Sequence, residues 1–366
     1  MEKMQNSIFN LLFFVGVILS LIYFIYREPF IVIIFSSIGF IMIFYYIFLD
    51  IKKNIYLIIF LAIFLTFYFL KLLFFQSVFN MSEFILFISH FGYAMYLLEQ
   101  KDSFKVIKRI YYILSIYLIF IYFIEGTLND ISIVSSANMV NYIFLGFTVL
   151  YLALYYKKSN KVIVHPTLLN LLISFLSLGR AGMIVSIILL LSIILLKSKD
   201  KYSKSTFGIL LIISPVVIIY TYNYVVDLII DLLTKYGTRT TFFEDSPRDK
   251  MWSDYLMRLD IEKIIFGYDD KIHTFAGYSN IHNSFLDFHY IFGVGGVFFL
   301  FIIIFFLLYF LMDKLYLYFI LITCLLFRGI TDTVMLVWMY DYILIYIILV
   351  GYETIYQKKR TKSLKI

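Results

Sequence analysis

The chain alternates long apolar runs with short polar connections, and the positive charge of those connections falls almost entirely on one side. Twenty of the 31 Lys and Arg residues lie in alternate connections and near the two ends, whereas the opposite short connections hold only Arg27 and Arg180. With 62% hydrophobic residues, no soluble core could bury these runs, so a bilayer is the expected solvent. We therefore expect an all-α, polytopic membrane helical bundle, with residues 1–366 forming a single integral membrane domain.

Twelve apolar segments approach the length of about 20 residues that a spanning helix needs. Cytoplasmic loops carry the excess of Lys and Arg in membrane proteins, so the charge bias predicts that both termini are cytoplasmic, in agreement with an even number of spans. The seventh, eighth and eleventh segments are short, and a re-entrant pair or a thinned membrane are the alternatives for them. The expected spans are Ile8–Tyr26, Phe30–Leu49, Ile55–Phe75, Met81–Leu98, Val106–Ile124, Met139–Tyr156, Val162–Leu176, Ala181–Leu196, Phe207–Tyr224, Phe292–Met312, Leu315–Ile330 and Val334–Tyr352.

One connection is far longer than the others. Residues 225–281 form a polar loop between the ninth and tenth segments, and the topology places this loop outside the cytoplasm. Long connections without structure of their own are uncommon in compact folds and are often functional. Ser246 is a good N-cap, Pro247 suits the first helical position, and apolar residues follow at helical spacing. The loop is thus expected to contain short helices, the first of them amphipathic and lying on the membrane surface.

Three polar residues outside the cytoplasmic connections stand where helices are expected to begin. Arg180 lies in a turn between the seventh and eighth segments, Arg248 lies in the first turn of the loop helix, and His282 leads into the tenth segment. A helix N-terminus offers unpaired N–H groups and a partial positive charge, so two guanidinium groups added there favour a phosphate or pyrophosphate. Each residue taken alone also fits an ordinary solvated or interfacial position. Their convergence in one anion site is the hypothesis.

Further ionisable residues are expected at the same level of the membrane. Arg328 lies deep in the eleventh segment, and such intramembrane charges are costly enough to be functional candidates by default. Lys71 is expected to extend its side chain to the surface. Asp287, His289 and Asp332 fall close to the same interface. The candidates for substrate contact are Arg239, Arg258, Arg328, Asn283 and Trp252.

Several chemistries are not supported by the sequence. It contains no G-x-x-x-x-G-K-[ST] phosphate-binding loop, no H-E-x-x-H metal motif and no D-x-D motif. The single Cys324 lies in an apolar segment, which excludes an internal disulfide and a cysteine-based metal site. The net charge of +7 follows from the cytoplasmic bias and implies no nucleic-acid partner. We therefore expect the substrate's phosphate to be held by cations and helix ends, with no metal and no cofactor.

At these residues the chain resembles the O-antigen ligase and polysaccharide polymerase (Wzy-type) superfamily of membrane glycosyltransferases. Members of that family have a Ser/Gly-Arg turn between central spans, an Arg followed by Trp and a Gly turn in a late outer loop, and a His-Asn pair before a Gly-rich span. The resemblance covers roughly residues 168–303, and the earlier spans match only in hydropathy. A second Gly that often appears after the loop turn is Tyr268 here. The matching residues are Ser177-Leu178-Gly179-Arg180, Arg248, Trp252, Phe266-Gly267, His282-Asn283 and Gly293-Val294-Gly295-Gly296.

The resemblance implies a glycosyltransferase in the bacterial plasma membrane, with its active site facing the periplasm or the exterior. The donor would be an oligosaccharide linked to undecaprenyl pyrophosphate, and the acceptor would be a sugar hydroxyl of another lipid-linked repeat unit. Arg180 and Arg248 would hold the pyrophosphate, and His282 would take the proton of the acceptor hydroxyl or hold the phosphate. Membrane lipid, a chain-length regulator and a flippase of the same pathway are the expected partners.

Surface-polysaccharide polymerase is the preferred activity within this resemblance, and three alternatives stay open. An O-antigen ligase would transfer the finished polymer to a different acceptor. A flippase for the same lipid-linked sugar would need charged groups at mid-bilayer and often repeated halves, whereas the charges here cluster toward one face and no repeat is visible. A non-catalytic scaffold would tolerate the loss of all three candidate residues.

Overall fold

The structure is a computed structural model that describes residues 2–75, 81–128, 131, 137–177, 179–198, 248–268, 274–278, 281–336 and 338–363. Within these residues 84% of the chain is helical and there is no strand, as the all-α prediction requires. Seven of the described helices are long and apolar enough to cross a membrane. They are α1 (Glu2–Tyr26), α2 (Pro29–Leu49), α3 (Ile51–Phe75), α4 (Met81–Glu99), α5 (Ser103–Glu125), α6 (Ala137–Ser159) and α13 (Val294–Met312).

Three further apolar helices are shorter, at the positions where the sequence had given short segments. These helices are α7 (His165–Leu176), α8 (Arg180–Lys197) and α14 (Tyr316–Thr331). The remaining helices are α10 (Arg248–Met257), α11 (Ile261–Phe266), α12 (Ser284–Phe292) and α15 (Tyr342–Ser363). The structure therefore supports a helical membrane protein with several spans. The expected ninth span, Phe207–Tyr224, lies outside the described residues.

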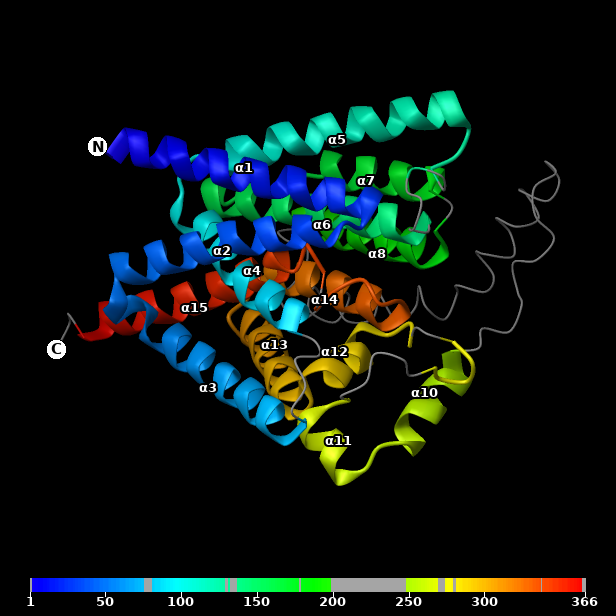
Figure 1. Ribbon diagram of the computed structural model, residues 1–366. Coiled ribbons are helices and arrows are strands. Elements are labelled where there is room, and N and C mark those ends of the chain that lie inside the picture. Colours follow the sequence, from blue (N-terminus) through cyan, green and yellow to red (C-terminus); the bar gives the residue numbers. More distant parts are fainter. Residues whose placement is uncertain are drawn as a thin grey trace.

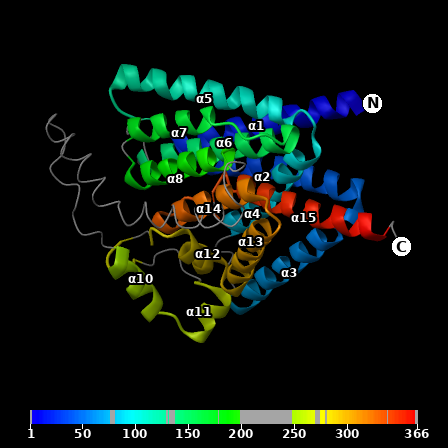
Figure 2. The ribbon, with the colours of Figure 1, turned by 180° about the vertical axis from the view of Figure 1, so that it is seen from behind.

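The long helices form a bundle in which α1 begins and α15 ends at the same end (Figures 1 and 2). The short helices α10, α11 and α12 lie toward the opposite end (Figure 1). Lysines at the end with the termini are held by acidic side chains: Lys53 Nζ lies 2.5 Å from Glu99 Oε1, and Lys157 Nζ lies 3.4 Å from Glu353 Oε2. The charge asymmetry read from the sequence is thus also an asymmetry of the folded bundle.

The centre of the bundle is packed closely enough to bring backbones into contact. A Cβ atom added at Gly92 of α4 would lie 1.9 Å from the carbonyl oxygen of Gly39 in α2, and one at Gly39 would lie 2.5 Å from the carbonyl oxygen of Ser89. Small residues allow this approach between membrane helices, where dispersion contacts replace the hydrophobic effect as the main attraction. The α2–α4 pair is therefore fixed by shape.

Two helix boundaries differ from the sequence expectation, and both changes matter for the site. The tenth segment does not begin at His282, because the short helix α12 ends at Gly293, whose φ of 54° reverses the chain before α13 begins at Val294. The twelfth segment does not begin at Val334 either. Residues 332–341 are non-helical, and α15 begins only at Tyr342.

Candidate functional site

The end of α14 carries a buried ion pair. Arg328, in the last turn of α14, has no exposed surface, and its Nη2 lies 3.6 Å from Oδ2 of Asp332. Its Nη1 also donates to the hydroxyl of Thr331 at 3.0 Å. A guanidinium in this setting needs a nearby negative charge, because burying an isolated charge is costly. Asp332 supplies that charge at the point where the helix ends.

Asp332 also binds the imidazole of His282. The distance between His282 Nδ1 and Asp332 Oδ1 is 3.2 Å, which places the proton of a neutral imidazole on Nδ1 and its lone pair on Nε2. Burial opposes ionisation of Asp332, but the hydrogen bond from His282 and the charge of Arg328 outweigh it and hold the pKa of this carboxyl below its usual value. One carboxylate thus orients a potential general base and neutralises a buried cation.

The loop that carries Asp332 is held rigidly. The hydroxyl of Ser284 donates to the carbonyl oxygen of Asp332 at 2.7 Å and accepts from the amide of Val334 at 3.0 Å. Asp341 accepts from the amides of Leu336 and Trp338, both at 2.7 Å. Non-helical backbone inside a membrane protein must have its polar groups satisfied by the protein, and these two side chains do so here.

Helix α10 brings the outer loop to the same place. Arg248 is its first residue, and the charge of Arg248 lies close enough to Arg328 for the two guanidinium groups to repel each other. Trp252 Nε1 donates to the carbonyl oxygen of Ile281 at 2.9 Å, directly beside His282. His282 itself has a φ of 50°, an uncommon conformation for a non-glycine residue that the surrounding contacts must hold in place.

A small hydrophobic cluster fixes α10 against the loop. Met251 and Tyr255 on one face of α10 are buried with three loop residues in a cluster separate from the main core, as expected for an amphipathic helix. The hydroxyl of Tyr255 lies 2.5 Å from His289 Nδ1 on α12. The other members of the cluster are Tyr268, Phe275 and Ile281.

Lys71 acts as a clasp for the outer region and does not extend to the surface as the sequence had suggested. Only 5% of Lys71 is exposed, and its Nζ donates to the carbonyl oxygens of Tyr268 at 3.0 Å and Ile291 at 2.6 Å. These acceptors lie in the outer loop and in α12, about two hundred positions further along the chain. The lysine therefore joins α3 to the elements that carry the candidate site.

The structure assigns other roles to two of the expected contact residues. Asn283 is the N-cap of α12, since its side-chain oxygen accepts from the amides of Phe285 and Leu286. Arg258 forms a bidentate pair with Asp254, with both N–O distances at 2.7 Å, on the outer face of the loop. Both contacts stabilise local structure. Arg239 lies outside the described residues, as do Ser246 and Pro247.

Helix α8 begins at Arg180, as expected, although the side chain of Arg180 is not among the described ones. Helix α8 packs against α14, and the turn before α8 lies at the end of the bundle where α14 ends (Figure 1). The glycine of the same turn motif, Gly182, is in contact with Asn141 of α6: an added Cβ would lie 2.0 Å from its amide. The start of α8 therefore has little freedom to shift.

The sequence thus pointed to a region that the fold does assemble from distant segments: His282, Arg248 and Arg328 share one end of the bundle with the start of α8. It did not identify Asp332 as the residue that links His282 to Arg328, because no local pattern reveals a pairing across 50 positions. In the described residues no group of three or more His, Cys, Asp or Glu side chains has a geometry suited to a metal ion.

Comparisons of the chain with protein-family models, with curated proteins and with solved structures found no match. The assignment of function therefore depends on the residues and the geometry of this chain.

Proposed function

We propose that this protein is a metal-independent glycosyltransferase that polymerises a surface polysaccharide such as O-antigen or capsule. It would transfer an oligosaccharide from undecaprenyl pyrophosphate to a hydroxyl of another lipid-linked repeat unit. The observation that carries the proposal is the contact of His282 and Arg328 with one carboxylate, Asp332, beside Arg248. A histidine oriented by an acid and surrounded by arginines suits proton abstraction next to a leaving pyrophosphate.

In the proposed reaction, the acceptor hydroxyl oxygen attacks the anomeric carbon of the donor sugar. The bond from that carbon to the pyrophosphate oxygen breaks, and the electron pair leaves with the lipid pyrophosphate. His282 Nε2 takes the hydroxyl proton, and Asp332 stabilises the imidazolium that forms. Arg248, together with Arg180 at the start of α8, stabilises the negative charge that grows on the pyrophosphate.

The proposal includes an orientation. The lysine-rich end that holds both termini faces the cytoplasm, with about twelve spans in all, and the site faces the periplasm or exterior of a bacterial plasma membrane. Lipid-linked repeat units would reach this side through a flippase, and a chain-length regulator would act on the product. Pyrophosphate is already a good leaving group, so this side needs no nucleotide.

The test is elongation by purified protein in detergent, with a synthetic lipid-pyrophosphate oligosaccharide as donor and acceptor and a gel ladder as readout. We expect His282→Ala and Arg248→Ala to lower the rate by about a hundredfold or more, the loss typical of removing a general base or a charge-stabilising donor. Lys250→Ala, an exposed cation on the same helix as Arg248, is the matched control and should elongate normally. Normal ladders from both site variants would refute the proposal.

The same assay separates the alternatives. A ligase would leave the donor unextended until its own acceptor is supplied, and a flippase would give no product in detergent because it has no vectorial task there. A scaffold would give no product from any variant, including the wild type.

A further inference from the structure

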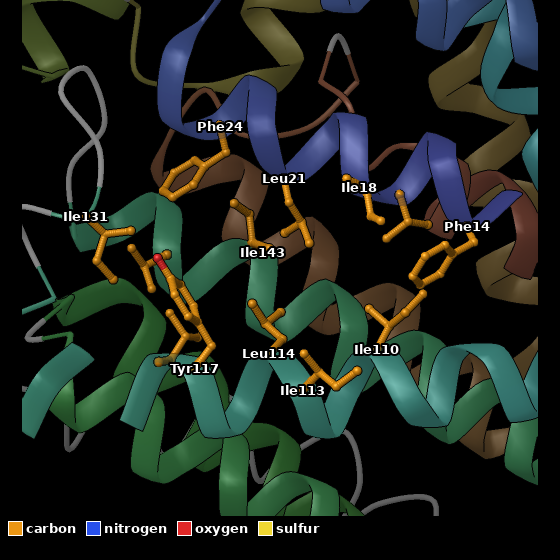
Figure 3. A pocket seen from close by; sticks show the side chains of 13 residues that line it. Phe14, Ile18, Leu21, Phe24, Ile110, Ile113, Leu114, Tyr117, Ile131 and Ile143 are labelled. Atoms are coloured by element: carbon orange, nitrogen blue, oxygen red, sulfur yellow. The ribbon is translucent and has the colours of Figure 1, made fainter. Parts of the chain in front are cut away.

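A groove of about 240 Å³ opens between α1 and α5, with α6 completing its wall (Figure 3). The side chains that line it are almost all aliphatic or aromatic, and Tyr117 carries the one phenolic hydroxyl among them. All three helices are candidate membrane spans. Representative lining residues are Phe14, Ile18 and Leu21 from α1, Ile110 and Leu114 from α5, and Ile143 from α6.

The groove is large enough to hold part of a hydrocarbon chain. An apolar protein cavity of about 150 Å³ stays dry and accepts a six-carbon ring, so a site of about 240 Å³ accepts a longer stretch of carbon. Water is a poor occupant because it would find almost no hydrogen-bonding partner on these walls. In a bilayer, the molecules that surround α1 and α5 are acyl chains.

A cation lies just beyond one end of the groove. Phe24 lines that end, and Arg27 follows it by three residues, at the point where α1 has ended. The guanidinium carbon of Arg27 lies 4.1 Å from the ring centre of Trp338 and 5.4 Å from that of Tyr23. Among the described residues no carboxylate forms an ion pair with Arg27, and its buried Nε has no hydrogen-bond partner.

We propose that the groove binds one acyl chain of an anionic phospholipid whose phosphate pairs with Arg27. The apolar walls select the chain, and the guanidinium selects the charge of the headgroup. A phospholipid carries both features on one molecule, with the phosphate at the membrane interface directly above the chain. This site is separate from the one at His282 and does not depend on the glycosyltransferase proposal. Its occupant would fill the space between α1 and α5 and hold them to the bundle.

The experiment measures lipid retained by the full-length protein. Protein purified in detergent is equilibrated with equal amounts of phosphatidylglycerol and phosphatidylcholine of identical chains, and bound lipid is counted by native mass spectrometry. We expect one retained phosphatidylglycerol per chain. Ile18→Trp places a large ring in the groove and should lower retention about tenfold, the change expected for a loss of one decade in affinity.

Ile22→Trp is the matched control for Ile18→Trp. Both isoleucines lie on α1, with 38% of Ile18 and 37% of Ile22 exposed, but only Ile18 lines the groove. The control should retain phosphatidylglycerol like the wild type. Equal retention by the two tryptophan variants would overturn the site.

Arg27→Gln tests the headgroup separately. This variant should still retain one lipid, with its preference for phosphatidylglycerol over phosphatidylcholine reduced to near unity. An unchanged preference would overturn the assignment of Arg27. Displacement of phosphatidylglycerol by an equal amount of undecaprenyl phosphate, or a second copy of the chain bound in place of lipid and lost in Ile18→Trp, would overturn the choice of occupant.

Discussion

Asp332 is the residue on which most of the candidate site depends. It is the only described carboxylate that pairs with both His282 and Arg328, and it lies where α14 ends and a rigid non-helical loop begins. Removing it would change two things at once: the tautomer and orientation of the imidazole, and the charge balance of a fully buried guanidinium. The two effects can be separated, because one concerns catalysis and the other concerns folding.

Asp332→Asn should lower the elongation rate by about a hundredfold or more, because the amide no longer fixes the proton on His282 Nδ1 or stabilises the imidazolium. It should also destabilise the protein by roughly 3–5 kcal/mol, since Arg328 loses its buried counter-charge. The rate is measured on folded, monodisperse protein, and thermal unfolding in detergent gives the second effect. In the double variant Asp332→Asn with Arg328→Met, stability should recover while activity stays low. Recovery of both would argue that Asp332 is purely structural.

Asp287 predicts a dependence of stability on pH. Burial and the negative charge of Glu83 raise the pKa of Asp287 from 3.8 to about 7, and α12 is too short to cross a membrane. Between about pH 4 and pH 7 the folded protein therefore holds a proton that the unfolded chain has lost, so stability should fall as pH rises through this window. Thermal unfolding from pH 5 to pH 8 measures the slope. Asp287→Asn should flatten it, and an unchanged slope would contradict the assignment.

At the scale of elements, the outer loop is located by contacts from helices far away in the sequence. Lys71 of α3 reaches two carbonyl groups, Trp252 of α10 holds Ile281, and the glycines at positions 267 and 293 lie against each other's backbone. None of these contacts involves a catalytic side chain. They decide how precisely Arg248 and His282 face one another, and catalysis is sensitive to displacements of about 1 Å.

Lys71→Met should loosen this docking without touching the proposed reacting groups. Methionine fills the same space but leaves the carbonyl oxygens of Tyr268 and Ile291 without their charged donor, at a cost of about 1–3 kcal/mol. We expect faster amide hydrogen exchange in residues 261–268 and in α12. Lys105→Met, at an exposed position of α5, is the control. Identical exchange in wild type and Lys71→Met would show that the clasp is dispensable.

Gly182→Ala tests whether the start of α8 is fixed by α6. The new methyl group would lie 2.0 Å from the amide of Asn141, so the helices must separate, and such overpacking typically costs about 1–3 kcal/mol. The unfolding temperature in detergent should fall. Gly295→Ala meets its nearest atom, on Phe67, at an ordinary 3.6 Å and should change little. Equal stability of the two variants would contradict a tight α6–α8 contact.

For the whole molecule, the decisive property is polarity from end to end. The termini and several lysines paired with acids occupy one end, and the short helices with the candidate site lie toward the other (Figures 1 and 2). The charge rule predicts that the lysine-rich end is cytoplasmic. This orientation determines which substrates can reach the site.

Cysteine labelling in intact cells tests the orientation. The single native Cys324 is only 1% exposed and should give little background. Lys250→Cys on α10 should react with a membrane-impermeant maleimide, and Lys358→Cys near the end of α15 should react only after the cells are opened. Because both lysines are exposed, their reactivity should differ only through the membrane side. The reverse pattern would invert the topology and remove the proposed substrate from the site.

The sequence by itself determined the class of fold, the polarity of the bundle and the neighbourhood of the site, because hydropathy and charge bias act through segment length and membrane side alone. It also located α8 and α10, whose starts follow from local turn and capping chemistry. Only the tertiary structure decided that Asp332 joins His282 to Arg328, that Lys71 is a clasp, and that the last span begins at Tyr342. These outcomes require side chains dozens or hundreds of positions apart to meet, and such distances are fixed by helix packing, which no local pattern encodes.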